Sequence, residues 1–170
     1  TFDPSPGTVE PASKTVTVGE PYGSLPTPLR TGYTAAGWWT GTDGTGTLVT
    51  EATNVTQAAN HTLHARWIAN TYYVAYDSNG GSGGMDNSTH TYDVSQPLTP
   101  NGYERTGYTF AGWATSTNGP VVYTDGQSVV NLSSIQGHVI RLYAVWNVSS
   151  NVVATPEFAP DGGLWEYGDV

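Results

Sequence analysis

The pentapeptide Arg-Thr-Gly-Tyr-Thr occurs at residues 30–34 and again, letter for letter, at residues 105–109. Each copy runs on into Ala-Gly-Trp, which ends at Trp38 and Trp113. Further out, Asp3 aligns with Asp77, and the closing Trp67 aligns with Trp146. The offset between the copies is therefore 74 residues at the start, 75 in the repeated box and 79 at the end. The chain is a tandem repeat, and the extra residues of copy two are expected near 131–137.

Both copies are predicted to form the same small β unit. Alternating and β-branched residues predict the strands, and Gly, Pro, Asn and Asp mark the turns between them. Asn79-Gly80-Gly81 is a strong signal for a turn with positive φ. A Pro-rich connection before the box allows at most one short helical turn. The strands are expected at 72–76, at 15–18 and 89–92, at 62–67 and at 139–146, and a further strand begins within each copy of the pentapeptide.

Composition excludes several classes of function. The chain has 21 Gly, 11 Tyr and 6 Trp among 170 residues, which favours short strands and many turns. Its formal charge of -9 leaves no basic surface to neutralise phosphates, so nucleic acid is not an expected partner. No apolar run approaches the roughly 20 residues that span a membrane, so direct membrane insertion is not expected. Without cysteine there is no disulfide, thiolate nucleophile or Cys-bound zinc.

The repeat predicts three units: residues 1–68, residues 69–147, and a segment 148–170 that opens a β-sandwich domain or a linker. Few residues precede the first turn of copy one, so its sheet is expected to be depleted. The chain also begins without Met, which we interpret as a segment of a longer protein. Three residues, 68–70, separate Trp67 from the next strand. Such a short linker predicts a stiff, extended and monomeric rod.

The repeated box supplies the candidate surface residues. Simple alternation puts Tyr33, Ala35, Gly37 and Trp39 on one face of the strand and Trp38 on the other. Small β units fill their cores with aromatics, so we expect Trp38, Trp67, Trp113 and Trp146 to be buried. Trp39 has no aromatic counterpart in copy two, where Ala114 follows Trp113. The candidate ligand-contact residues are Trp39, Tyr33 and Tyr108.

No set of residues in the chain carries recognisable chemistry. Serine lacks a nucleophile-elbow motif, no pair of carboxylates has a convincing spacing, and His61 and His64 would point to opposite faces of a strand. Aspartates in the turns, such as Asp43 and Asp125, do not follow the calcium-loop pattern. We therefore expect no catalytic residue, no cofactor and no metal site.

The motifs together resemble a known family. The pattern "YDSNGGSGGM" with "RTGYTFAGW" and "LYAVW" in copy two, and its counterpart in copy one, is similar to the internalin B-repeat, also called the Listeria-Bacteroides repeat. The resemblance implies a compact β-grasp-like (ubiquitin-like) unit, found in tandem in long bacterial surface proteins and associated with adhesion or spacing. Copy one departs from the pattern at Ala35, at Arg66, and at Pro-Ser-Pro in place of Asn-Gly-Gly. The tail "ATPEFAPDGG" more weakly resembles the start of a chitobiase C-terminal, Fn3-like domain.

These observations predict a non-catalytic stalk or spacer segment of an extracellular, cell-surface or cell-wall protein, with a role in adhesion or protein interaction. Its partner would be a surface protein or a glycan of a host or neighbouring cell. Two alternatives stay open: a module that binds mucin or another polysaccharide, and an accessory region of a surface glycosidase.

Overall fold

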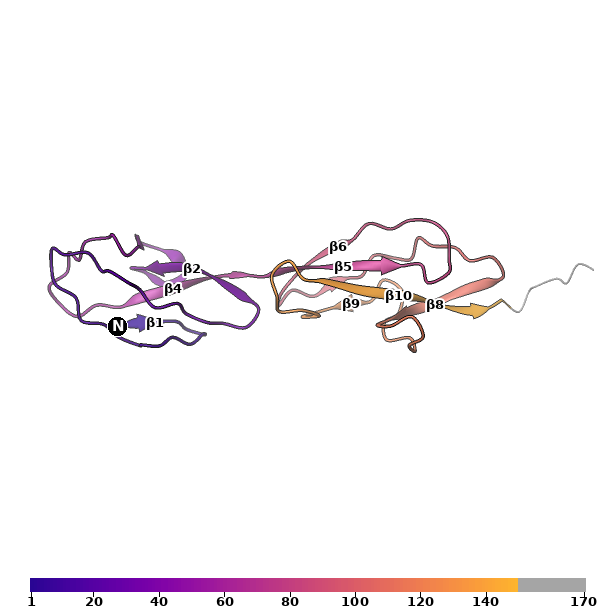
Figure 1. Cartoon of the computed structure of the whole chain (residues 1–170), viewed down its shortest axis with the longest axis horizontal. Helices are drawn as coiled ribbons and strands as arrows, with labels where there is room; N and C mark the ends of the chain where they lie inside the picture. Colours follow the sequence, from indigo (N-terminus) through magenta and orange to yellow (C-terminus); the bar gives the residue numbers. More distant parts are fainter. Residues whose placement is uncertain (150–170) are drawn as a thin grey trace, which may run out of the picture.

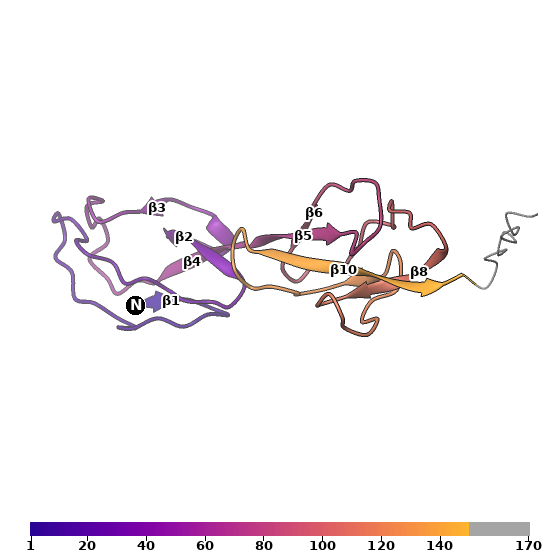
Figure 2. The same ribbon diagram turned by 45° about the vertical axis from the view of Figure 1, so that its right-hand side comes forward.

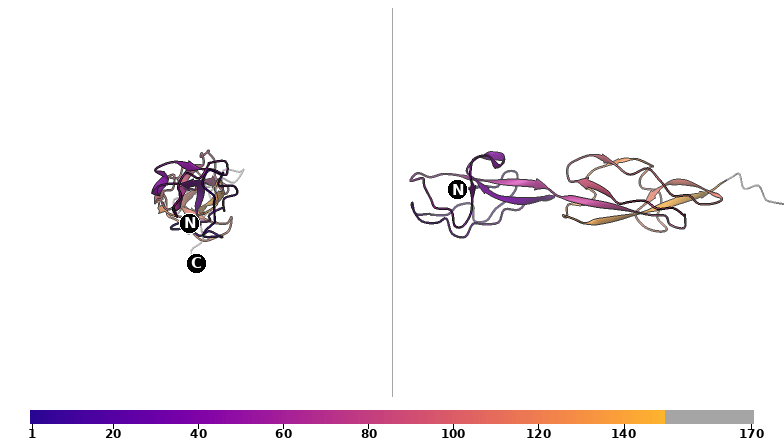
Figure 3. Two further views of the ribbon diagram at one scale, coloured as in Figure 1. Left: turned by 90° about the vertical axis from the view of Figure 1, so that its left-hand side faces the viewer. Right: turned by 90° about the horizontal axis from the view of Figure 1, so that it is seen from above.

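The computed structural model describes residues 1–149, which form two β units placed end to end (Figure 1). Seen along the long axis, repeat one largely covers repeat two (Figure 3). The described residues contain no α-helix, and their helical content is one 3₁₀ turn, η1, at Thr42–Gly44. The predicted fold class, mainly β, is confirmed, but the helical turn follows β2 and does not lie in the Pro-rich connection, where the sequence allowed one. The predicted unit 148–170 lies almost wholly outside the described residues.

Repeat one contains a four-stranded sheet with the strand order β1-β4-β2-β3. The first strand runs parallel to β4, whereas β2 is antiparallel to both β4 and β3. The sheet therefore holds the first and last strands of the repeat side by side (Figure 2). Its strands are β1 (Phe2–Asp3), β2 (Tyr33–Trp39), β3 (Leu48–Val49) and β4 (Leu63–Ala69).

Repeat two has the corresponding sheet, with the order β6-β5-β10-β8, and a further two-stranded sheet of β7 and β9. Its first strand, β5, is again parallel to the last, β10, over five residue pairs. In repeat one the parallel pairing covers two residue pairs. The strands are β5 (Thr71–Asp77), β6 (Ser88–Thr91), β7 (Gln96–Pro97), β8 (Tyr108–Ala114), β9 (Ser128–Val129) and β10 (Val139–Val148).

The predicted strand at residues 15–18 is wrong, although its alternation is cleaner than that of its counterpart in repeat two. Residues 15–17 have no assigned secondary structure and residue 18 lies in a turn, whereas the counterpart forms β6. The reason is the partner: β6 pairs with the first half of β5 at residues 71–74. The first strand of repeat one consists of Phe2 and Asp3. Alternation alone does not make a strand when no neighbour is present to accept its hydrogen bonds.

Each repeat has its own hydrophobic core, and the two cores share no residue. Trp38 is 3% exposed and Trp113 is 0% exposed, so the expectation that these two indoles are buried is confirmed. Trp67 and Trp146 are half-buried against the two cores, and their indole N–H groups donate to Pro4 O and Ser78 O. These two hydrogen bonds tie the last strand of each repeat to its first turn.

A break in the register explains how Trp38 reaches the core. The pairing of β2 with β4 shifts between Ala35 and Trp38, and Gly37 within that interval has a φ of 90°. In repeat two, Gly112 has a φ of 143° at the same position, and a Cβ there would collide with Val121 and the backbone of Tyr123. Gly37 and Gly112 therefore permit a β-bulge in each repeat. The bulge places the following tryptophan on a different face of the strand from the one that simple alternation predicts.

A buried histidine makes the stability of repeat two depend on pH. His90 is 1% exposed, stacks on Tyr72 with ring centroids 5.5 Å apart, and contacts Ser88 Oγ through Nε2 at 2.9 Å. Burial lowers the pKa of His90, because the charged imidazolium loses its hydration. In the unfolded chain His90 therefore takes up a proton at a higher pH than in the folded one. The stability of repeat two is at its full value above the pKa of about 6.5 of the unfolded histidine, and it is lost as the pH falls from there through the pKa of folded His90.

We therefore expect the unfolding temperature of repeat two to decrease as the pH is lowered from about 7.5 to about 5. Thermal denaturation followed by NMR would measure it. The control is His90→Val, since repeat one carries Val16 at the equivalent position. This variant should lose the part of the pH response that is specific to repeat two. An unchanged response would contradict the role given to His90.

Candidate functional site: the joint between the repeats

Tyr33, one of the three candidate ligand-contact residues, contacts the other repeat. It lies at the start of β2, where its phenol O–H donates to Asp93 Oδ2 at 2.8 Å. Its ring meets Tyr92 edge to face, with centroids 5.9 Å apart, and the Arg30 guanidinium carbon lies 3.4 Å from its centroid. The repeated box of repeat one therefore ends in a contact with the second turn of repeat two.

Asp93 is held in place by a second residue of its own repeat. Asn131 Nδ2 donates to Asp93 Oδ1 at 2.8 Å, and the Asp93 backbone N–H donates to Asn131 Oδ1 at 2.6 Å. The hydrogen bonds from Asn131 and then Tyr33, with the charge of Arg30, lower the pKa of Asp93. The bond to Asp93 in turn raises the pKa of Tyr33. The charged carboxylate is thus the form that the joint binds.

Asn70, in the linker, connects both repeats through its backbone and its side chain. It is 7% exposed. Its backbone N–H donates to Gly32 O in repeat one, and its carbonyl accepts from Tyr92 N–H in repeat two. Its amide oxygen accepts from Thr34 Oγ1 at 2.6 Å, and its amide nitrogen donates to Ser134 O at 2.8 Å. A buried side chain with both polar ends satisfied restricts the linker.

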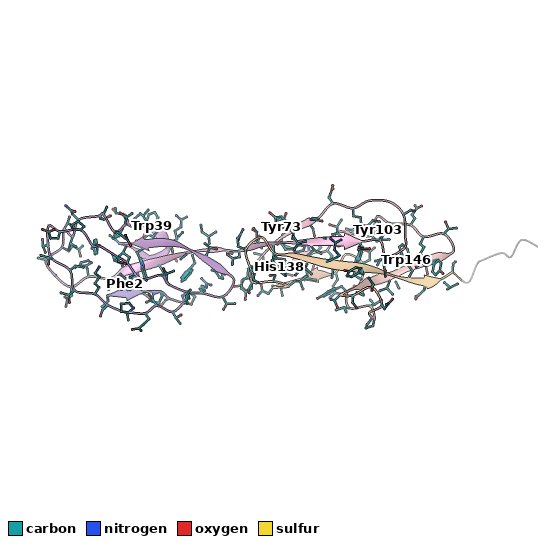
Figure 4. All side chains as sticks on the ribbon, in the orientation of Figure 1. Phe2, Trp39, Tyr73, Tyr103, His138 and Trp146 are labelled. Atoms are coloured by element: carbon teal, nitrogen blue, oxygen red, sulfur yellow. The ribbon has the colours of Figure 1, made fainter. Side chains whose placement is uncertain are left out.

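The extra residues of repeat two lie at this joint. Ser134 accepts from Asn70, and Gln136 Oε1 accepts from the Thr71 backbone N–H at 2.9 Å. The neighbouring His138 and Tyr73 lie at the end of repeat two that faces repeat one (Figure 4). We define the joint as residues 30–34, 68–71, 92–93 and 131–136. The longer loop of repeat two thus closes over the linker.

Gly32 allows the two repeats to approach closely. Its φ is 76°, a conformation that side chains rarely adopt. A Cβ at this position would overlap the Tyr92 ring. Glycine is therefore required at position 32 for two reasons: the positive φ of its backbone, and the space that the Tyr92 ring of the next repeat occupies.

Tyr108 occupies the equivalent position at the far end of repeat two. It is 36% exposed, and the Arg105 guanidinium carbon lies 3.9 Å from its ring centroid, as Arg30 does over Tyr33. The Ser149 backbone N–H donates to Gly107 O at 2.8 Å, which reproduces the bond from Asn70 to Gly32. The chain therefore leaves repeat two along the path on which it leaves repeat one.

Trp39, the third candidate, lies in repeat one (Figure 4), at the end of β2 opposite to Tyr33. It is half-buried, its indole N–H donates to Ala36 O at 3.1 Å, and the Arg66 guanidinium carbon lies 5.5 Å from its ring centroid. The structure thus brings no two of the candidate residues together. A ligand contact by any of them stays a prediction.

The described residues contain no cluster of side chains suited to bind a metal ion. Within residues 1–149 there is no group of three or more His, Asp or Glu side chains arranged to hold a metal ion. A helix long and apolar enough to cross a membrane is likewise absent from this part of the chain. His64 Nδ1 contacts Asp3 Oδ2 at 3.1 Å, and both side chains are partly exposed.

The model of the Listeria-Bacteroides repeat domain matches the chain twice, over residues 1–66 and 72–145. The chain belongs to this family. Two similar proteins come from Evansella cellulosilytica. One, provisionally named a Gly-rich membrane protein, is 30% identical over 143 residues, which is 79% of this chain and 16% of the relative. The other, provisionally named a membrane protein, is 29% identical over 140 residues, which is 80% of this chain and 18% of the relative. The chain spans less than a fifth of each.

Proposed function

We propose that this segment of Listeria-Bacteroides repeats is a stiff, non-catalytic spacer that holds other parts of a bacterial surface or secreted protein at a fixed distance and angle. The joint carries the proposal. Asn70 is bonded to both repeats, and Tyr33 is bonded to Asp93 across the boundary. A linker that only connected two domains would not need these contacts, since domains joined by a small or polar interface move relative to one another.

Burial within the joint supports stiffness more than its exposed charge does. Asp93 is exposed, so its bonds to Tyr33 and Asn131 are screened by solvent. Asn70 and Gly32 are buried, and bending here would expose their hydrogen-bonding groups without replacing their partners. We therefore assign most of the resistance to bending to the linker and to Gly32, and the choice of angle to Tyr33.

The proposal extends to the fold and the location. We propose a β-grasp-like fold for each repeat, and the parallel pairing of its first and last strands within a mixed sheet supports this. The segment is extracellular or attached to the cell surface, which the membrane-protein names of the two relatives support. Adhesion and glycan binding stay sequence-based predictions. Of the three candidate residues, Tyr33 is engaged by the joint.

Distances between two labels, one on each repeat, test the spacer. The chain has no cysteine, so Ala52→Cys and Asn118→Cys place two spin labels at exposed positions on opposite sides of the joint. We expect double electron–electron resonance to give one narrow distribution of the distance between these two labels. The control pair, Asn87→Cys with Asn118→Cys, lies within repeat two and reports label mobility alone. A cross-joint distribution much broader than that of the control pair would contradict the proposal.

A further inference from the structure

One row of side chains, here called the outer row, crosses all four strands of the sheet of repeat one. The strand register pairs Asp3 of β1 with His64 of β4, and His64 with Trp39 of β2. Leu48 of β3 completes the row beside Trp39. None of these four residues belongs to the core of repeat one. Because side chains that pair across strands share a face, the outer row lies on the face of the sheet that points away from the core.

The polar end of the outer row is a carboxylate and an imidazole that solvent can reach. Asp3 Oδ2 lies 3.1 Å from His64 Nδ1, and the two side chains are 39% and 24% exposed. The hydrogen bonds from Ser5 and then from His64 lower the pKa of Asp3, so its carboxylate is charged at neutral pH. Since a carboxylate only accepts hydrogen bonds, His64 carries a proton on Nδ1. Its Nε2 makes no hydrogen bond within residues 1–149 and can bind a ligand.

Arg66 places a second polar group beside the indole of Trp39. Its guanidinium carbon lies 5.5 Å from the ring centroid, whereas Arg30 stacks on Tyr33 at 3.4 Å. The larger distance leaves space over the indole. A Cβ on Gly44 would overlap the stem of Arg66, so this glycine makes room for the side chain. Arg66 is exposed and forms no salt bridge with any residue in the described part of the chain, so its N–H groups are available to a ligand.

Repeat two lacks this combination at the same positions. With the offsets of 75 and 79 residues, Trp39 corresponds to Ala114 and Arg66 corresponds to Val145. Ala114 is 0% exposed, whereas Trp39 is half-buried. The same sheet therefore forms without the indole and without the guanidinium, and the fold does not require either of them.

We propose that the outer row and Arg66 bind a neutral pyranose sugar of an oligosaccharide. The C–H groups on one face of the sugar ring stack on Trp39, because the face of an aromatic ring carries partial negative charge. Hydroxyl groups at the edge of the sugar donate to Asp3 and to His64 Nε2 and accept from Arg66. Apolar contact combined with a few placed polar groups is typical of sites for small ligands.

The charges of the site favour a neutral sugar over other partners. The carboxylate of Asp3 and the guanidinium of Arg66 balance each other, and the whole chain has a formal charge of -9. An acidic sugar would be repelled by Asp3 and by the field of the chain. An apolar protein surface would bury both charged groups without giving them partners, which is costly. The hydroxyl groups of a neutral sugar can satisfy both.

NMR titration of the full chain with defined hexasaccharides tests the proposal. The neutral probes are cellohexaose, mannohexaose and N-acetylchitohexaose, and hexagalacturonate is the acidic comparison. At least one neutral probe should shift the indole N–H resonance of Trp39 and the ring resonances of His64, while the resonances of repeat two stay in place. The absence of a shift with all three neutral probes would overturn the proposal. Binding of hexagalacturonate as tight as that of the best neutral probe would overturn the choice of a neutral sugar.

Two variants locate the binding site. Trp39→Ala should weaken the binding of the best neutral probe by about tenfold, because the stacking surface is lost. Arg66→Val should also weaken it. Both changes introduce the residue that repeat two has at that position, so both variants should fold. The matched control is Tyr143→Ala, which removes the aromatic residue that pairs with Ala114 in repeat two. It should leave the affinity unchanged. Full affinity in Trp39→Ala, or equal losses in Trp39→Ala and Tyr143→Ala, would show that the outer row is not the site.

Discussion

Replacing Trp113 with alanine should unfold repeat two and leave repeat one folded. The indole is fully buried among three aromatic rings. Its ring centroid lies 4.9 Å from those of Tyr76 and Phe110 and 6.3 Å from that of Tyr103. Removing a buried tryptophan costs about 3–5 kcal/mol, which approaches the total stability of a domain this small. Repeat one should survive because its core contains no residue of repeat two. Denaturant titration followed by NMR would resolve the two transitions.

The tryptophans of repeat one provide the controls for this experiment. Trp38→Ala should have the mirror effect, because Trp38 is 3% exposed, packs on Phe2 and donates to Pro26 O. Trp39→Ala should cost much less than Trp38→Ala, since Trp39 is half-buried. If Trp113→Ala shifted both transitions equally, the two repeats would not be independent units.

Gly32→Ala should uncouple the two repeats. The new methyl group would force a side chain into a φ of 76° and would displace the Tyr92 ring. The backbone strain and the lost contact together should cost about 1–3 kcal/mol. With Tyr92 displaced, the bond between Tyr33 and Asp93 loses its alignment. We expect the distance distribution between labels at positions 52 and 118 to broaden clearly.

Gly19→Ala separates the two causes. Gly19 also has a positive φ, of 88°, but a Cβ there would meet nothing within 4 Å. This variant should therefore lower the stability of repeat one through backbone strain and leave the cross-joint distances unchanged. A broad distribution for Gly19→Ala, or a narrow one for Gly32→Ala, would show that Gly32 does not act through Tyr92.

Much of the fold follows from the sequence because its signals are local. The recurrence of Arg-Thr-Gly-Tyr-Thr predicts two units, and in the structure β2 and β8 begin at the tyrosine of the two copies. Asn79 and Gly80 have the expected positive φ. Burial of Trp38 and Trp113 was also predictable, since small β units depend on aromatics for their cores. In each case neighbouring residues in the chain determine the outcome.

The site was less predictable, because its contacts are distant in sequence. Tyr33 was a candidate for a surface role, yet its partner Asp93 lies 60 residues away in the other repeat. One signal could have found the joint. The extra residues near 131–137 distinguish repeat two from repeat one, and they lie against the linker at Asn70. An insertion in one copy of a repeat was evidence for a contact that this copy alone makes.

By itself, the sequence determined the number of repeats, their β character, the glycine positions that bend the chain and the family. These properties depend on backbone conformation and on hydrophobic pattern over short distances. The tertiary structure alone decided that residues 15–18 form no strand, that Trp38 leaves simple alternation, and that Tyr33 belongs to a joint. A strand exists through its neighbour's hydrogen bonds and a joint through two surfaces, and neither partner is visible in a local pattern.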